Sequence, residues 1–516
     1  LQGEFNNVFA EKHAVNVMVG YEMRGNKSTQ VHTKGFGYDP KALTTKPLDF
    51  PDGFNDISSS LYQQYKRTEN ENRYLSYYMT ASYSYDNRYT VFGSMRFDGS
   101  NLFGVSDKYK YLPLWALSAA WNVDREDFLK NADWLSNLKL RLSYGLQGNV
   151  DKNTSPYIVG TWGETSGLGS SSEPTISVTS PPNQKLRWEK TSNWNVGIDM
   201  GVLNNRITFS VDGYYRKSKD LIGVRSLPLE NGFDFTSMNW AELTNKGFEF
   251  TMSTVNIRTQ AFRWVLDFHI EHNKSNVDRI TVREKKTPSL QGYSVGALFK
   301  LNTAGLDENG IQMFWKNGER VSLQDFFALE VGSDGAPVSK LTNKEFSELY
   351  TYAGTTEPKF TGGFINKFYY KNFDLTISTS FVIDQTMQET PFYSPSEMSP
   401  GSNYSKRVAD SWSPSNPDGI DPKIMNHSYW MDSDNDFLFT WMGDSQGGFK
   451  NYDYWFKDIS YLRVNSIRLG YTLPENIIKK LRLGSARISV EARNPFVIAS
   501  SYKGYFDPET WGNVYT

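Results

Sequence analysis

The 516-residue sequence contains no cysteine. It can therefore form neither a disulfide framework nor a thiolate metal site, and its lack of thiols is compatible with an oxidising bacterial envelope. An excess of charge of one sign is also missing, because 55 Lys and Arg stand against 57 Asp and Glu, for a formal net charge of −2. A chain so balanced has no basic footprint for nucleic acid, and we expect no nucleic-acid partner.

Long hydrophobic runs are absent too. The mean hydropathy is −0.55, and no run approaches the about 20 apolar residues of a membrane-spanning helix. Aromatic residues are abundant instead, since 31 Tyr, 33 Phe and 14 Trp make up 15% of the chain. Tyr and Trp are favoured where one end of a ring is apolar and the other is wet, as in the interfacial girdles of transmembrane barrels and in ligand grooves. Barrel strands escape hydropathy analysis because alternate residues face water.

Residues 138–147, LKLRLSYGLQ, alternate apolar and polar side chains. The same alternation recurs at 89–97, 194–200, 207–212, 262–271, 374–384 and 487–493. One such strand fits either a half-buried sheet of a soluble protein or a barrel wall between lipid and water. Strands as long as 184–202 and 205–222 favour the barrel, because sandwich strands are usually shorter.

The connections between these segments alternate between short and long. Short turns are expected at Asp86-Asn87, 203–205, 256–260 and 371–372, and long connections at 24–71, 99–110, 149–182, 223–240, 277–356 and 388–458. Transmembrane barrels have short periplasmic turns and long extracellular loops. We therefore predict an all-β fold, an antiparallel transmembrane β-barrel wall of about 14 strands, with an uncertainty of about two.

Several segments together resemble the SusC-like branch of the TonB-dependent outer-membrane transporters of Bacteroidetes-type bacteria. They follow the family's order over nearly the whole chain: LKLRLSYGLQGN (138–149), 186–222, LTNKGFEFTMS (243–253), 357–378, SWSPSNPDGIDPKI (411–424), 457–474 and YKGYFDPET (502–510). Family members are considerably longer. The resemblance thus implies that residues 1–516 form part of a single barrel domain of about 22 strands. We expect the N-terminal signal, the plug, the first strands and the last strand to lie outside this sequence, unobserved or on another chain.

Two sets of residues are candidates for a functional site. Flat rings in the long connections could stack on sugars or pack against peptide side chains, or they could pack the loops upon themselves or meet a partner protein; these are Trp162, Trp240, Trp315, Tyr352, Tyr404, Trp430 and Trp441. Side chains on the polar parity of the strands would line a hydrated lumen; these are Arg141, Gln147, Asp199 and Arg216.

Three sequence patterns resemble catalytic or metal-binding motifs, but each lacks a feature that its motif requires. Residues 443–447, GDSQG, fit the G-x-S-x-G pattern of serine hydrolases, but no helical period follows Ser445. The acidic run 432–436 lacks the Gly and Glu that a calcium loop needs. His269 and His272 would point to opposite faces of a strand. We expect no catalytic residues, no metal site and no cofactor, and thus no enzyme.

The resemblance implies a function at the bacterial outer membrane. The protein would import an oligomeric nutrient, a glycan or a peptide, with energy delivered by TonB to the part of the protein outside this sequence. A SusD-like surface lipoprotein would cap the barrel, and outer-membrane lipid would surround it. The alternatives are a binding or structural barrel that transports nothing and, less favoured, a surface β-rich hydrolase.

Overall fold

The three-dimensional description comes from a computed structural model of the chain. It describes residues 1–33, 38–45, 65–102, 111–152, 154–166, 172–233, 235–280, 285–333, 335–396, 398, 401, 403–425, 440–443, 446–499, 502 and 507–509. Strands dominate these residues, and none of the described helices has the length and apolar content needed to cross a membrane.

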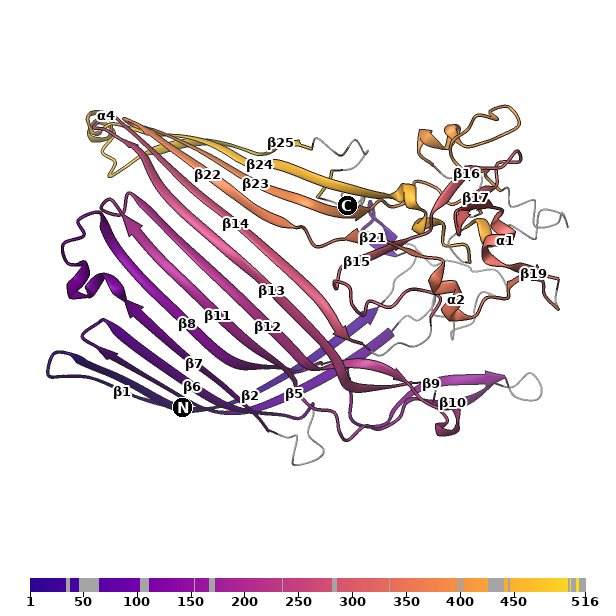
Figure 1. Cartoon of the computed structure of the whole chain (residues 1–516), viewed down its shortest axis with the longest axis horizontal. Helices are drawn as coiled ribbons and strands as arrows, with labels where there is room; N and C mark the ends of the chain where they lie inside the picture. The colour runs from indigo at the N-terminus through magenta and orange to yellow at the C-terminus, as the bar shows by residue number, and fades with distance from the viewer. Residues whose placement is uncertain are drawn as a thin grey trace.

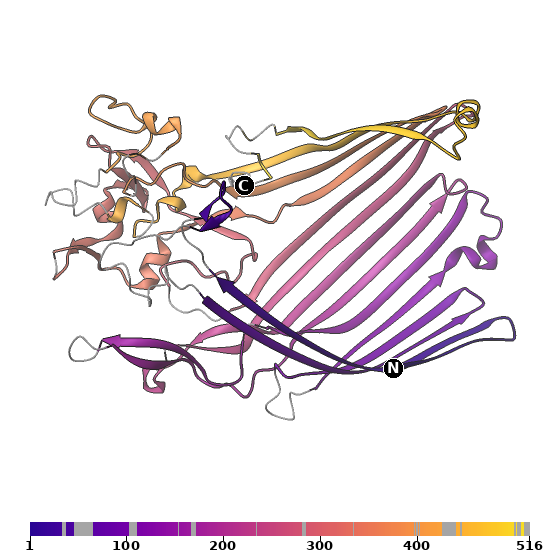
Figure 2. The same cartoon turned by 180° about the vertical axis from the view of Figure 1, so that it is seen from behind.

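Fourteen long strands form one antiparallel sheet, and each strand pairs with the next one along the chain. The strands run side by side at a tilt, and the sheet curls (Figure 1, and from behind in Figure 2). They are β1 (Gln2–Phe9), β2 (His13–Thr33), β5 (Tyr65–Tyr85), β6 (Tyr89–Ser100), β7 (Tyr111–Asn122), β8 (Leu135–Asn149), β11 (Glu189–Val202), β12 (Ile207–Ser226), β13 (Phe235–Arg258), β14 (Phe262–Arg279), β22 (Phe360–Tyr370), β23 (Phe373–Gln388), β24 (Phe456–Thr472) and β25 (Arg487–Ile498). The predicted barrel wall and its strand number are confirmed.

Tight turns join the strands at one end of the sheet. Asp86 and Asn87 between β5 and β6 both have positive φ angles, 51° and 52°. Such angles are required in the hairpin turns whose twist matches the twist of the strands, and Asn and Asp tolerate them better than most residues. Leu203, Asn204 and Asn205 between β11 and β12 also have positive φ angles. The turn residues expected at both places are confirmed.

The long connections lie at the other end, and two of them are shorter than predicted. The segment 24–71 was expected to be a loop, but β2 continues to Thr33 and β5 begins at Tyr65. Similarly, the expected loop 223–240 shrinks to residues 227–234, because β12 and β13 pair as far as Ser226 and Phe235. These strand ends contain many polar residues, so the alternation of apolar side chains did not reveal them. Backbone pairing continues through these ends, supported by cross-strand contacts such as that of Arg24 with the Tyr74 ring.

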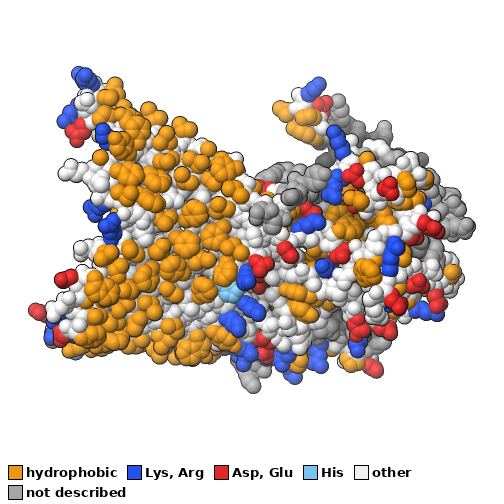
Figure 3. Space-filling view, turned by 45° about the horizontal axis from the view of Figure 1, so that its top comes forward, with side chains coloured by type: hydrophobic (Ala, Val, Ile, Leu, Met, Phe, Trp, Pro, Cys, Tyr) orange, Lys and Arg blue, Asp and Glu red, His pale blue; other side chains and the backbone are white. Residues whose placement is uncertain are grey.

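The sheet has an apolar face and a polar face. Because residues opposite each other in an antiparallel sheet lie on one face, the register places Trp194 beside Tyr144 and Tyr215, and Ile198 beside Leu140 and Val211. The apolar face carries these side chains, which form a broad band (Figure 3). From Ile207 to Tyr215 the band covers about 27 Å of tilted strand, at about 3.4 Å per residue, which is of the order of an outer-membrane band.

Two of the long connections fold together into a compact unit, which we call the loop layer: the described residues of 285–359 and 389–455. It contains β15 (Ala297–Lys300), β16 (Thr303–Leu306), β17 (Gln312–Lys316), β18 (Glu319–Val321), α1 (Leu323–Phe327), β19 (Leu329–Val331), β20 (Pro337–Ser339), α2 (Asn343–Glu348) and β21 (Thr351–Thr355). The backbone of Leu301 pairs with the segment around Tyr452, which joins the two connections. The loop layer lies beside the loop end of β22–β24 (Figure 1).

The main hydrophobic core of the described chain lies in the loop layer and not in the sheet. Both connections contribute to it equally, with Leu301, Phe314, Leu323, Phe326, Phe327, Leu329 and Phe346 from the first, and Tyr393, Met425, Trp441, Met442, Phe449, Tyr452 and Trp455 from the second. Rings meet face to face or edge to face, as between Phe314 and Phe326, whose centroids are 4.3 Å apart. Aromatic burial of this extent stabilises a fixed loop conformation. The connections are therefore structured elements.

Outside these units, the connections contain a few short elements. They are the hairpin of β9 (Val159–Ser166) and β10 (Ser172–Ser180), the pair β3 (Tyr38–Asp39) and β4 (Thr44–Thr45), the helix α4 (Glu475–Lys480) and several 3-10 turns. Helix α4 lies at the end of the sheet that has the tight turns (Figure 1).

Candidate functional site

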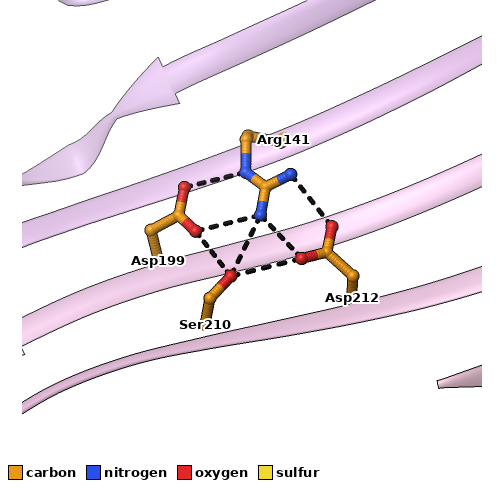
Figure 4. Close-up of polar contacts among 4 residues, drawn as sticks. All are labelled: Arg141, Asp199, Ser210 and Asp212. Atoms are coloured by element: carbon orange, nitrogen blue, oxygen red, sulfur yellow. Dashed lines mark hydrogen bonds and ion pairs between the residues drawn. The ribbon is translucent and has the colours of Figure 1, made fainter. Parts of the chain in front are cut away.

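An ion-pair network lies on the polar face of the sheet. The Arg141 guanidinium on β8 donates to the Asp199 carboxylate on β11 at 2.8 and 2.9 Å, and to the Asp212 carboxylate on β12 at 2.9 Å through two nitrogens. The Ser210 hydroxyl donates to Asp199 at 2.7 Å and closes the network (Figure 4). Hydrogen bonds to charged groups in such forked geometry are about twice as strong as neutral ones.

The network depends on a position without a side chain. Gly197 on β11 lies between Arg141 and Asp212 in the register. A Cβ atom there would lie 2.6 Å from an Asp212 oxygen and 2.7 Å from the Arg141 Cζ. Only glycine therefore leaves room for the guanidinium to cross β11 and reach the third strand.

The polar face continues as a row of acidic residues. Asp212, Glu249 and Glu271 occupy directly paired positions on β12, β13 and β14. Arg141 is the only ion-pair partner in this row within the part of the chain that the structure describes. Gln147 is exposed on the same parity of β8. Arg216 is also exposed, and its guanidinium lies 4.5 Å from the centroid of the Tyr214 ring. A polar solute on this face would meet hydrogen-bonding groups of both charges.

A cluster of exposed rings lies in the loop layer. The Tyr293 and Tyr352 rings stack with their centroids 5.2 Å apart, and Phe299 meets both of them edge-on, at 5.1 and 6.1 Å. Tyr352 is 47% exposed and Tyr293 40%. The pairing of β15 with β21 places Phe299 opposite Tyr352, and Tyr293 lies shortly before β15. We call this group the aromatic cluster. It presents flat apolar surface with two hydroxyl groups, a combination suited to stacking on a ligand.

The aromatic cluster is anchored above the loop end of the polar face. Ser275 on β14 is buried, accepts a hydrogen bond from the Val295 backbone N–H at 3.0 Å and donates to the Glu357 carboxylate at 2.6 Å. Burial, together with the neighbouring Tyr293 and Glu357, raises the pKa of the Tyr352 hydroxyl, which therefore remains protonated at neutral pH. The cluster is a hydrogen-bond donor surface as well as a stacking surface.

Among the aromatic residues expected at a binding site, Tyr352 alone is placed in this cluster. Trp315 on β17 is 51% exposed and Tyr404 39%, so both also present rings at the surface. Tyr293 and Phe299 were missed because nothing in the sequence spacing predicts that β15 pairs with β21. The only feature of the sequence that could have indicated β15 is the short apolar segment ALFK, shortly before β16.

Two other expected aromatic residues pack against neighbouring groups of the structure. Trp441 is 2% exposed, and its indole N–H donates to the Pro337 carbonyl at 3.1 Å within the core of the loop layer. We therefore leave Trp441 out of the ligand-contact set. Trp240 lies in β13 and not in a loop, and the guanidinium groups of Arg279 and Arg225 lie 4.3 and 5.5 Å from its ring. The Trp240 ring is therefore already in contact with two cationic side chains of the sheet.

Several of the remaining candidates lie outside the described residues. Trp162 belongs to β9, and its side chain is outside the described residues, as are all of Trp430, Ser445 and the acidic run 432–436. His269 and His272 occupy alternate parities of β14, as expected, and His272 packs against Phe248 on the apolar face. The described residues contain no group of three or more His, Asp or Glu side chains placed to hold a metal ion.

Comparison with known proteins gives the same fold. The family profile described as "TonB dependent receptor-like, beta-barrel" matches residues 5–297, more than half of the chain. The solved structure of the RagAB peptide transporter aligns with a TM-score of 0.72 and 20% identity, over 98% of this chain and 52% of that one. This likeness concerns the fold alone.

Curated relatives carry the same family name. The TonB-dependent receptor SusC of Bacteroides thetaiotaomicron is 27% identical over 521 aligned residues, covering 95% of this chain and 46% of SusC. The TonB-dependent receptor P3 of Formosa agariphila is 27% identical over 463 residues, covering 85% of this chain and 42% of P3. The chain thus spans about half the length of the curated relatives it matches. It belongs to the TonB-dependent receptor-like β-barrel family, and its sheet is part of a bacterial outer-membrane β-barrel.

Proposed function

We propose that this chain forms part of an outer-membrane importer of an oligomeric nutrient, driven through TonB. The two faces of the sheet carry the proposal. An apolar band suits lipid, while the opposite face presents Arg141, Asp199, Asp212 and an acidic row to solvent. A wall built this way lines a hydrated path through hydrocarbon.

Substrate contact is assigned to the external mouth. The aromatic cluster offers two exposed rings, those of Tyr293 and Tyr352, at the loop end of β14 and β22, with the partly buried Phe299 ring packed against both. Rings of this kind stack on sugar faces and pack against peptide side chains. A ligand captured there would pass next to the polar face below it. Trp315 and Tyr404 are secondary contact candidates because both rings are exposed.

Two observations favour a peptide over a glycan as the imported oligomer. RagAB is described as a peptide transporter and shares the fold. Peptides have charged termini and side chains that the polar face could bind through Arg141, Arg216 and the acidic row. We therefore propose a peptide first and a glycan second. By likeness to SusC, a SusD-like surface lipoprotein would cover the loop layer, and TonB would act on the part of the protein outside this sequence.

An uptake experiment tests the proposal. Cells that carry the full-length gene would be grown on a defined peptide mixture or on oligosaccharides as the limiting nutrient. We expect growth to require both the gene and an intact TonB system. The variant with Tyr293→Ala and Tyr352→Ala should reduce uptake about tenfold, since each lost stacking contact costs on the order of 1 kcal/mol. Tyr157→Ala, which removes an exposed ring from another loop, is the matched control.

Three results would contradict parts of this proposal. Growth that does not depend on TonB would favour the non-transporting barrel. Unchanged uptake by the Tyr293→Ala, Tyr352→Ala variant, at normal surface abundance, would remove the aromatic cluster from the proposed binding site. Solubility of the protein without detergent would favour the hydrolase alternative instead.

A further inference from the structure

A group of lysines lies on the apolar face, at the edge nearer the long connections. It comprises Lys190, Lys217, Lys219, Lys246 and Lys274, from β11, β12, β13 and β14, and we call it the lysine patch. Blue side chains gather at this edge of the apolar band, next to the loops (Figure 3). The patch is on the opposite face from Arg141 and the acidic row, so it cannot belong to the proposed transport path.

The register fixes the depth of the patch. Lys246 and Lys274 lie in one row with Trp194 and Tyr215, directly opposite each other across β13 and β14. Phe248 and His272 form the next row toward the tight turns, where the band becomes apolar. Trp and Tyr mark the level at which hydrocarbon gives way to headgroups. The two ammonium groups therefore extend from the headgroup level at the loop side of the membrane.

Lys246 and Lys274 form a pair of like charges. Side chains directly opposite in an antiparallel pair are about 5 Å apart at Cβ, where like charges destabilise the sheet. Both lysines are exposed. In the described part of the chain, the side chain of neither lysine makes a hydrogen bond or an ion pair. A bound anion between them would remove the repulsion.

Local carboxylates neutralise other members of the patch but not this pair. Lys190 lies 3.8 Å from Asp220, and Lys217 lies 3.7 Å from Glu242 and 3.9 Å from Asp278. The acidic partners thus lie on the loop side of the patch, away from the apolar band. Net positive charge remains on the side that faces the membrane.

From these positions we infer that the lysine patch binds the phosphate groups of an anionic lipid in the loop-side leaflet of the outer membrane. Clusters of lysine at headgroup level attract anionic lipids. Acyl chains of the lipid would lie against the apolar band, with the ring of Phe248 below the phosphate and the rings of Tyr215 and Trp194 on its β12 side. Charge complementarity and continuity with the lipid-facing band select a lipid over a soluble anion. This inference is independent of the proposed import function.

The test uses the full-length protein, purified from membranes and placed in phosphatidylcholine nanodiscs with or without diphosphoryl lipid A. Native mass spectrometry would measure how much phosphorylated lipid is retained. We expect retention by the wild-type protein, and an affinity lower by about tenfold in the Lys246→Gln, Lys274→Gln variant, since both positive charges next to the phosphate are lost. Lys246→Arg with Lys274→Arg should keep binding.

The control has the same loss of charge at the opposite end of the sheet. Lys479→Gln with Lys480→Gln alters α4, on the side with the tight turns, and should leave retention unchanged. The single variant Lys219→Gln should have a smaller effect than the double variant. The inference is overturned if the Lys246→Gln, Lys274→Gln variant retains lipid A as well as the wild type, or if the wild type retains no more lipid A than phosphatidylcholine.

Discussion

Arg141 on β8 reaches Asp212 on β12 across the whole of β11, and their side chains meet at 2.9 Å above the backbone of Gly197. Three adjacent strands are thereby joined by side chains as well as by backbone pairing. Both side chains are about a quarter to a third exposed, so solvent screens the pair in part. Its contribution is to hold the register and to fix where charge lies on the polar face.

Replacing Gly197 with alanine should therefore weaken the barrel wall. The added Cβ would come within 2.7 Å of both ion-pair partners, and overpacking of this kind costs about 1–3 kcal/mol. Urea unfolding of the protein in detergent micelles, followed by the gel mobility of the unboiled barrel, measures the change.

The matched control is Gly213→Ala on the apolar face of β12, where an added Cβ meets nothing within 4 Å. We expect an effect within about 0.5 kcal/mol there. Equal destabilisation by the two substitutions would contradict the role assigned to Gly197.

A second prediction concerns the core of the loop layer. Trp441→Ala removes a ring that is 2% exposed, and such substitutions cost about 3–5 kcal/mol. The loss should open the loop layer while the sheet stays folded. Limited proteolysis should then cut within 285–359 and 389–455, with unchanged mobility of the unboiled barrel. Trp315→Ala, which removes an exposed ring, should leave the protease pattern as it is.

The third prediction is a dependence on pH. Burial raises the pKa of the Asp421 carboxyl above its usual value, Asp410 raises it further, and Arg407 opposes the shift in part. Within the described chain, one Asp421 oxygen is buried without a hydrogen-bond partner. The protonated form is thus favoured in the folded loop layer, so its stability is greatest below the unfolded pKa of about 3.9 and falls as the pH rises through the higher folded pKa.

Protease resistance of the loop layer, measured at pH values from acidic to neutral, checks this. Asp421→Asn should remove the decline of resistance with rising pH and make the loop layer more resistant at neutral pH. A decline of the same size in the variant would assign the pH dependence to another group.

The fourth prediction uses the absence of cysteine, which makes single-cysteine labelling unambiguous. A spin label at Val196 or Ile198 should be reached by oxygen dissolved in lipid, because both lie on the apolar face of β11. A label at Asn195 should be reached by a water-soluble nickel complex, because it lies on the polar face. Reversed accessibilities would contradict the assignment of the two faces.

The sequence predicts the sheet well because its signal is local. Alternation in residues 138–147 specifies which face each side chain occupies, and the register with 194–202 follows once one face must be apolar. Asp86-Asn87 specifies a tight turn for the same local reason. Strand ends such as 24–33 and 65–71 were not recognised, because polar residues on both parities carry no alternation.

The loop layer is not predictable in this way. Trp441 and Trp315 look alike in the sequence, yet one is buried and the other is exposed. The burial of Trp441 depends on its packing against Phe327 and Phe346, about 100 residues earlier in the chain, and loops of this length give no periodic signal. The sequence also does not reveal that Gly197 leaves room for the Arg141 guanidinium, or that Arg141 pairs with Asp212. Both depend on the register of three strands.

The shared core has a practical consequence for engineering. Each long connection contributes half of one apolar interior, so neither is an independent module that can be exchanged. A chimera that takes one of them from a relative would display the unmatched half to water and invite degradation. Grafting a new specificity onto this scaffold requires both segments to be transplanted as a single cassette.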